Sequence, residues 1–228
     1  MKNKLLTALL GIFIALLIVT FSIGLPIYFR PFYYIQVDLM DIPSYASDEY
    51  KSFTKDEIIE AYDELLDYLT VPGCEFKTGV FKYSESGKSH FVDCKGLFDL
   101  NAYAFLISLV GLVTLLILNK KGVFELWRPF GMNIAFSSGA YLLGGFAIIG
   151  GLVAINFDVA FTIFHKIFFP GKDNWLFSWY EDEIIRILPQ DFFMNCAILI
   201  FVSIVLLCVG CIASGLIPRA RAKMAAED

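Results

Sequence analysis

The sequence predicts an all-α membrane protein with four transmembrane helices and a largely helical extracytoplasmic cap between the first two. Of its 228 residues, 57% are hydrophobic and only 18% are charged, which is unusual for a soluble domain. Four stretches contain no Asp, Glu, Lys, Arg or His, and each is long enough to cross a bilayer as a helix: residues 5–27, 101–118, 130–157 and 192–217. This pattern disfavours a soluble enzyme, a disordered chain and a nucleic-acid-binding protein.

These stretches divide the chain into eight segments. The segments are a cytosolic start with the first transmembrane helix (1–27), the cap (28–100), the second helix (101–118), a cytosolic loop (119–129), the third helix (130–157), an extracytoplasmic loop (158–191), the fourth helix (192–217) and a cytosolic tail (218–228). The first stretch has a basic start but is too long for a secretory signal, and no small-residue cleavage site follows it. We therefore expect a retained span.

The distribution of positive charge predicts the orientation of the spans. Lys and Arg resist translocation and are concentrated in cytosolic loops. Residues 1–4, 119–129 and 218–228 are dense in Lys and Arg, with 8 of the 18 in the chain. The segments 28–100 and 158–191 contain 20 of the 23 Asp and Glu residues. We therefore expect both termini in the cytosol and any chemistry on the outer face of the plasma membrane.

The cap contains a predicted amphipathic helix in the stretch TKDEIIEAYDELLDYL. Thr54 and Glu57 have capping-box spacing, in which each side chain satisfies a free backbone amide of the first turn. Apolar residues then recur at helical spacing on one stripe: Ile58, Ile59, Tyr62, Leu65, Leu66 and Leu69. The acidic residues on the opposite side are most simply a solvated surface.

Cysteine and glycine patterns indicate structural features. Cys74 and Cys94 share the translocated side, where a disulfide can survive, so a bridge between them stays open as an alternative. The third predicted span contains small residues four positions apart, at Ala140 and Gly144 and again farther along, a spacing that permits close helix packing in lipid. A flexible gate is the functional alternative for these glycines.

The two histidines are the leading candidates for chemistry. The sequence has no GxSxG, HExxH or paired CxxC motif, so it supports neither a nucleophile elbow nor a zincin site nor a thiolate metal site. His90 lies shortly before the second predicted span and His165 shortly after the third, so both are expected at the outer membrane boundary. Imidazole is the side chain whose ordinary pKa suits proton transfer near neutrality. The plain alternative is two amphipathic side chains at an interface.

Asp93 follows His90 by three positions. On a helix the carboxylate and the imidazole would share a face, and the carboxylate would orient the ring and support its charged form. The alternative is a helix-terminal acid beside Lys95, which we include among the supporting residues.

The second outer loop supplies further candidates for supporting or substrate-binding roles. Asn174, Trp175 and Arg186 lie among many aromatic residues, including Phe168 and Phe169. Such aromatic density forms either a membrane-interface belt or the wall of a pocket. The Arg186 side chain could bind a carboxylate or a phosphate, or could extend along apolar surface with its charge in water.

Three motifs together resemble one family across nearly the whole chain. HxxDxKxLF precedes the second span, FHKIFFPGKDNWLF follows the third, and IIRILPQDFF precedes the fourth. This arrangement is similar to that of the lipoprotein intramolecular transacylases of Gram-positive bacteria. The chain departs from the family pattern at Gly87, where an acid is common, and at Cys94, where a small aliphatic residue is usual. Asp93 is therefore the more plausible carboxylate partner of His90.

The resemblance implies an acyltransferase that uses no cofactor. Its substrate would be a diacylglyceryl-modified lipoprotein, whose sn-2 acyl chain moves to the α-amino group of the N-terminal cysteine and leaves the lyso form. The family's two catalytic histidines correspond to His90 and His165, with the choice of base and acid left open. The other partners expected are membrane lipids, and no nucleic acid. Two alternatives stay open: a di-histidine haem membrane protein, and a non-catalytic four-span scaffold or adhesion protein.

Overall fold

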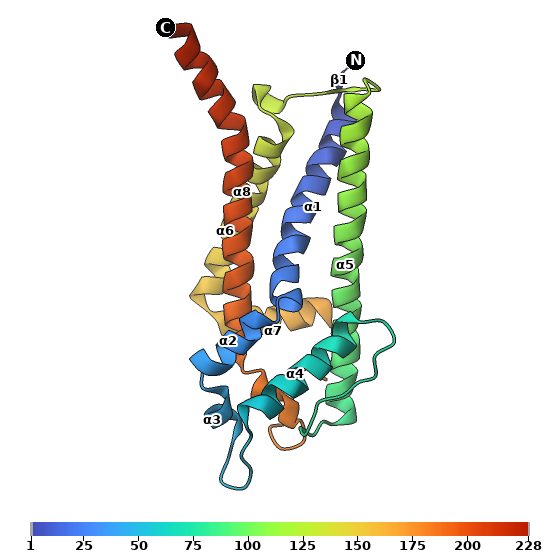
Figure 1. Ribbon diagram of the computed structural model, residues 1–228, viewed down its shortest axis with the longest axis vertical. Helices are drawn as coiled ribbons and strands as arrows, with labels where there is room; N and C mark the ends of the chain where they lie inside the picture. The colour runs from blue at the N-terminus through green and yellow to red at the C-terminus, as the bar shows by residue number, and fades with distance from the viewer. Residues whose placement is uncertain (1, 228) are drawn as a thin grey trace. The chain divides into compact units, whose positions relative to one another are not determined.

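A computed structural model describes residues 2–227 and confirms the predicted fold class (Figure 1). Four of its helices are long and apolar enough to cross a membrane: α1 (Lys4–Tyr28), α5 (Glu85–Lys120), α6 (Ile134–Ile155) and the part of α8 that spans Gln190–Ile217. The remaining helices are α2 (Pro31–Leu39), α3 (Ile42–Ala46), α4 (Lys55–Thr70) and α7 (Phe157–Phe168), with short 3-10 turns η1 (Pro129–Gly131) and η2 (Glu183–Ile187). Helix α8 as a whole extends over Gln190–Glu227.

The chain forms two compact units; three of the boundaries between them fall within α1, α5 and α8, and the fourth falls between α6 and α7. The first unit contains the chain up to Ile23, then Ala102–Ile155, and then the part from Leu199 onward. Its four helices lie side by side in Figure 1, with Leu10 packed against Leu115 and Ile18 against Ile204. Many large apolar side chains in this unit point outward, for example Ile148 at 69% exposure. Outward apolar surface on every spanning helix is what contact with lipid requires.

Two glycines of α6, Gly139 and Gly150, pack against α8; Gly150 belongs to one of the predicted pairs, Gly150 and Ala154, and Gly139 belongs to none. A Cβ atom on Gly139 would lie 2.8 Å from Cys211 Cβ and 2.9 Å from Cys208 O. A Cβ on Gly150, three turns farther along the same face, would collide with the ring of Phe201. Gly144, which belonged to a predicted pair, has open space beside it instead.

The first unit also contains two very short strands that the sequence did not predict. Strands β1 (Lys2–Asn3) and β2 (Glu125–Leu126) pair in parallel. The Thr7 hydroxyl accepts a hydrogen bond from Trp127 N at 2.9 Å just beyond this pairing. Two residues are too few for an alternating pattern, so sequence periodicity gives no signal for such strands.

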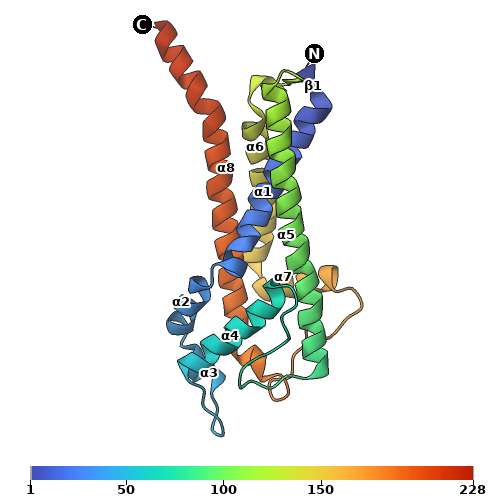
Figure 2. The same cartoon turned by 45° about the vertical axis from the view of Figure 1, so that its right-hand side comes forward.

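The second unit contains Gly24–Asn101 and Asn156–Ile198 and has the larger aromatic core. Figures 1 and 2 show α2, α3 and α4 next to one another in this unit. Tyr33 of α2 is fully buried and stacks on Tyr62 of α4 with ring centroids 3.6 Å apart. The Tyr33 hydroxyl donates a hydrogen bond to Ile187 O at 2.7 Å, which joins α2 to η2.

The amphipathic helix of the cap is confirmed as α4. Thr54 Oγ1 accepts a hydrogen bond from Glu57 N at 3.3 Å, and Thr54 N donates to Glu57 Oε2 at 2.8 Å, so the capping box is formed in both directions. All six residues of the predicted apolar stripe pack in the core; five are buried and Ile59 is partly buried. Burial of this stripe, more than local propensity, holds the helix in place.

Loss of the Thr54 N-cap of helix α4 should lower stability measurably. We expect Thr54→Ala to reduce the free energy of unfolding by about 1 kcal/mol, because the first-turn amide of Glu57 loses its acceptor, Thr54 Oγ1. The measurement is the midpoint of thermal unfolding of the purified protein in detergent. Ser52→Ala, at an exposed position outside the helix, is the matched control and should leave that midpoint unchanged. Equal midpoints for Thr54→Ala and the natural protein would contradict the assigned role of the cap.

Helix α5 begins at Glu85, sixteen residues before the charge-free stretch that begins at Asn101. His90, Asp93 and Lys95 therefore lie on the first turns of a long helix. Near the end of the third predicted span, helix α6 ends at Ile155 and a new helix, α7, begins after Asn156. Asn156 is the N-cap of α7, and its side chain accepts a hydrogen bond from Val159 N at 3.0 Å. The separate helix α7 places His165 in its last turn.

Candidate active site

The structure brings the two histidines together within the second unit. The ring centroids of His90 and His165 are 5.6 Å apart, with an angle of 31° between the ring planes. Both side chains are buried, at 5% and 6% exposure. Seventy-five positions separate the two residues in the sequence, so the fold, and not local structure, creates this pair.

The hydrogen bonding of His165 fixes its neutral tautomer. His165 Nδ1 lies 2.7 Å from Phe161 O, one turn earlier in α7. A carbonyl oxygen only accepts hydrogen bonds, so Nδ1 carries the hydrogen and the lone pair of the neutral ring is on Nε2. Burial lowers the pKa of His165 below its ordinary value, while the bond to Phe161 O opposes that change. The neutral ring, which can accept a proton, is therefore favoured near pH 7.

Aromatic rings surround both imidazoles. Trp175 stacks on His165 with centroids 4.6 Å apart and an angle of 26°, and Phe161 lies 4.3 Å away on α7. Phe169 contacts both imidazoles, at 4.8 Å from His90 and 5.7 Å from His165. Phe177 packs edge-on against His90 at 5.5 Å. Rings in these positions limit access of water to the imidazoles.

Asp93 joins α5 to the loop that follows α7. Its carboxylate accepts hydrogen bonds from Lys172 Nζ at 2.6 Å and from Asn174 Nδ2 at 3.0 Å. Asn174 Nδ2 also lies 3.4 Å from Ser89 Oγ. The sequence led us to expect Asp93 to orient His90 directly, but its hydrogen bonds instead hold the loop that carries Asn174 and Trp175 against α5. Lys172 was not among the predicted site residues, because its partner lies 79 positions away.

Two buried polar atoms in this region have no hydrogen-bond partner among the described residues: His90 Nδ1 and Asn174 Oδ1. The Asn174 amide lies next to His90. Buried polar groups are nearly always satisfied in native proteins, and atoms left over at a candidate site are positions where a substrate can bind. His90 Nδ1 can act as a hydrogen-bond donor when it carries the ring hydrogen, and Asn174 Oδ1 can act as an acceptor.

Cys94 is a site residue that sequence reasoning did not select. Its Sγ lies 3.3 Å from His90 Nε2, one turn along α5. The four-residue spacing on a helix could have indicated this contact. All five cysteines have free thiols, so the alternative of a Cys74–Cys94 bridge is not realised in the structure.

The remaining predicted residues lie in other surroundings. Lys95 Nζ donates a hydrogen bond to Tyr68 O and lies over the Tyr68 ring at 5.1 Å, against α4. Phe168 is 48% exposed and packs on Phe164 with centroids 4.6 Å apart. Arg186 is buried, and its guanidinium is bound to a carboxylate of the chain itself, Asp48 Oδ2, at 2.7 Å.

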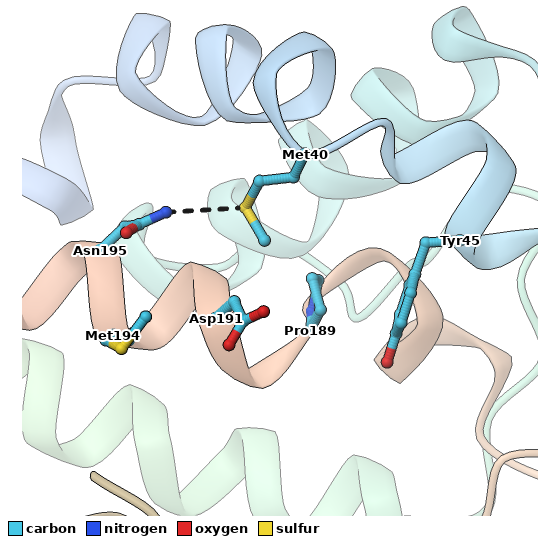
Figure 3. Close-up of a pocket in the computed structure, with 6 residues that line it drawn as sticks. All are labelled: Met40, Tyr45, Pro189, Asp191, Met194 and Asn195. Carbon is cyan, nitrogen blue, oxygen red and sulfur yellow. Dashed lines mark hydrogen bonds between the residues drawn. The ribbon is translucent and has the colours of Figure 1, made fainter.

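The second unit contains a separate hollow of about 340 Å³, and Figure 3 draws the residues that line it. Asn195 lies at one side of it, where its amide nitrogen is 3.7 Å from Met40 Sδ. The lining residues are Met40, Tyr45, Pro189, Asp191, Met194 and Asn195. This set shares no residue with the aromatic surroundings of the two imidazoles. Within residues 2–227, no group of three or more His, Cys, Asp or Glu side chains is placed to hold a metal ion.

Comparison with solved structures shows the class of protein to which this fold is similar. The whole fold is similar to that of membrane-integral transacylases, as three structures from Bacillus cereus show. The first is the in meso structure of the membrane-integral lipoprotein intramolecular transacylase Lit, to which this chain is 27% identical, with a TM-score of 0.81. The match covers 98% of this chain and 97% of the Lit chain. Two structures of variants of that enzyme, with one histidine replaced by arginine or by alanine, are each 26% identical, with TM-scores of 0.77. They cover 97% and 96% of this chain and 93% and 94% of their own.

The family model then defines the particular family. The model for the lipoprotein intramolecular transacylase Lit matches residues 8–193, and the chain belongs to this family. The resemblance stated from the sequence motifs is thereby confirmed, and the protein is a membrane-integral transacylase. Family membership supports this function and not the haem or scaffold alternatives. No curated protein sequence matches the chain.

Proposed function

We propose that the protein transfers the sn-2 acyl chain of a diacylglyceryl-modified lipoprotein to the α-amino group of the lipoprotein's N-terminal cysteine. The single observation that carries this proposal is the buried contact of two imidazoles in a member of the transacylase family. The substrate contains both the amine and the ester, so the nucleophile is tethered. The transition state closes a ring of about eight atoms, and the protein needs mainly to hold the reactive conformer.

The energetics of the proposed reaction require no cofactor. An ester becomes an amide, which is downhill without ATP. The carbon–nitrogen bond forms, the bond from the acyl carbon to the glycerol oxygen breaks, and the proton released by nitrogen ends on that oxygen. The difficult point is the α-amino group, which has a reference pKa of about 7.7 to 8 and is mostly a non-nucleophilic ammonium at neutral pH. A base beside it is therefore useful.

His165 is assigned as the base in this proposal. Its Nδ1 hydrogen is held by Phe161 O at 2.7 Å, so Nε2 is the atom that accepts the amine proton. The lowered pKa keeps the ring neutral before the reaction. The stacked Trp175 then presents its π face to the ring, which stabilises the imidazolium once it forms.

His90 is assigned as the hydrogen-bond donor. We place the hydrogen of its neutral ring on Nδ1, the buried atom that has no protein acceptor. From there it donates a hydrogen bond to the oxyanion of the tetrahedral intermediate and then to the departing glycerol oxygen, which receives its proton from the His165 imidazolium. Asn174 Oδ1, the buried acceptor beside it, binds an N–H of the substrate amine. In this arrangement Asp93 and Lys172 support the site by holding Asn174 in position.

The proposed location of the reaction is the extracytoplasmic side of the plasma membrane. Lys and Arg are dense in the predicted cytosolic segments, whereas the second unit contains most of the acidic residues. A lipoprotein carries its diacylglyceryl group in the outer leaflet after export. With both termini cytosolic, His90 and His165 would face the side where that substrate is found.

The test is a mass-spectrometric assay of purified protein with a synthetic diacylated lipopeptide. We expect a product of unchanged mass whose fragment ions place one acyl chain on the cysteine nitrogen and a monoacylglyceryl group on sulfur. An N-acetylated lipopeptide, which cannot accept the acyl chain, is the matched control substrate. If the folded, full-length protein leaves the acyl chain on the glycerol, the proposed reaction is wrong.

The pKa of His165 gives a prediction of its own. With only two histidines in the chain, His90→Asn leaves one imidazole to follow by NMR in ¹⁵N-histidine-labelled protein. Because burial disfavours the charged ring, we expect His165 to protonate only below the ordinary histidine pKa of about 6.5. The folded state then binds fewer protons than the unfolded state just below that value, so stability falls as the pH is lowered through it. A midpoint above 6.5 would contradict this assignment.

A further inference from the structure

Asp182, in the loop before η2, is a buried carboxylate that has no part in the chemistry described above. It is 3% exposed and accepts three hydrogen bonds. Oδ1 accepts from Ser84 N and from Ser84 Oγ, both at 2.7 Å, and Oδ2 accepts from Ser178 N at 3.1 Å. A buried carboxylate with several charge-assisted hydrogen bonds is a strong anchor between the segments that it joins. Here those segments are the loop after Trp175 and the residue before α5.

Ser84 relays this anchor to the helix that carries His90. Its hydroxyl donates to Asp182 and accepts from Gly87 N at 3.0 Å, which is the geometry of a helix N-cap. The negative charge of Asp182 therefore lies at the N-terminus of α5, where the helix dipole favours it. His90 is six residues beyond Ser84, so the start of the helix fixes the position of His90 along the helix axis and its angular position around that axis.

Gly87 provides the space that the carboxylate occupies. A Cβ atom at position 87 would collide with Asp182 Oδ1 and would lie 3.0 Å from both Asp182 Cγ and Phe177 Cε1. Phe177 in turn packs on the His90 ring at 5.5 Å. A side chain at position 87 would therefore displace the carboxylate and push a ring that touches His90. The small residue and the distant carboxylate form one complementary arrangement.

We infer that Asp182 is a positioning residue for His90. From the loop before η2 it caps the first turn of α5, in the space that Gly87 leaves free, and so sets where the His90 ring lies relative to His165. The inference rests on the role proposed above for His90. A displacement of about 1 Å in a catalytic group costs about a hundredfold in rate. The loss should appear in kcat, because Asp182 is hydrogen-bonded to the protein and not to the substrate.

The test compares kcat and KM for four variants in the lipopeptide assay. We expect Asp182→Ala to lower kcat by about 10- to 100-fold while KM changes less than about threefold. Asp182→Asn keeps the volume and one acceptor oxygen, so its loss should be smaller. Gly87→Asp alone should also lose activity, because two carboxylates would compete for one space. Asp173→Ala, which removes an exposed acid from the same loop, is the control and should keep the natural kcat.

The decisive comparison is the double variant Gly87→Asp with Asp182→Ala. An aspartate in the third helical position can cap the same first turn, so the double variant should have a higher kcat than Asp182→Ala alone. Such mutual rescue shows a specific carboxylate requirement, which general damage to the fold would not produce. An unchanged kcat in Asp182→Ala, or a loss that Gly87→Asp fails to relieve, overturns the inference. The proposed role of His90 is judged separately, by His90→Ala.

Discussion

His90→Ala and His165→Ala should each lower the turnover of the lipopeptide by about a hundredfold to ten-thousandfold. This range is the usual contribution of general acid–base assistance, and each variant removes one of two buried rings that lie 5.6 Å apart. The amount of N-acylated product against time, measured by mass spectrometry, gives the rate. His165→Asn should be no better than His165→Ala, because an amide cannot accept the amine proton.

Matched controls separate this effect from damage to the helices. Ser86→Ala on α5 and Lys166→Gln on α7 change exposed neighbours of the two histidines and should leave the rate within about twofold, as surface substitutions usually do. The double histidine variant should be much less impaired than the product of the single losses, because the two rings act as a unit. Near-normal rates in both single variants would rule out the two-histidine mechanism, even where acyl transfer persists.

Replacing Arg186 should cause the largest loss of stability. The guanidinium is 3% exposed and donates to Asp48 Oδ2 at 2.7 Å, to Trp179 O at 3.1 Å and to Ala46 O at 3.4 Å. We expect Arg186→Met to lower the free energy of unfolding by about 2 kcal/mol, because two carbonyl groups lose a buried donor and Asp48, which is itself 33% exposed, loses its partner. Thermal unfolding in detergent measures the change.

Arg30 is the appropriate comparison for Arg186. Its guanidinium pairs with Asp63 and Asp67 but is 31% exposed, so water screens the interaction. Arg30→Met should cost less than about 1 kcal/mol. If the two arginine variants unfolded at the same temperature, the structural role of the buried guanidinium would be refuted. A loss of activity without a loss of stability in Arg186→Met would point to a substrate anion instead.

The helical framework could be predicted because its signals are local. Charge-free stretches mark the spanning helices, and the spacing of Thr54, Glu57 and the apolar stripe marks α4 with its cap. These signals need only neighbouring residues and a knowledge of helix geometry. The same reasoning missed the helical start of α5, because residues 85–100 carry several charges and lack the continuous apolar run that identified residues 101–118.

The candidate site was predictable only in part. The rarity of histidine and the family motifs singled out His90 and His165, but no single-sequence pattern shows which distant residues meet. Asp93 bonds to Lys172 over 79 positions, and Ser84 bonds to Asp182 over 98. For Arg186 the sequence allowed either binding of an anion or extension of the side chain toward water. Its actual partner, Asp48, lies 138 positions earlier in the chain. Such contacts depend on how the two segments of the second unit, Gly24–Asn101 and Asn156–Ile198, pack together, which periodicity does not encode.

The indole stacked on His165 gives the enzyme an optical probe of its own chemistry. Trp175 lies 4.6 Å from the imidazole centroid, close enough for a protonated ring to quench its fluorescence. The other two tryptophans, Trp127 and Trp179, can be replaced by phenylalanine to leave this single emitter. In such a variant, stopped-flow emission after mixing with lipopeptide would follow the charge on His165 during a single turnover, with no label added to either molecule.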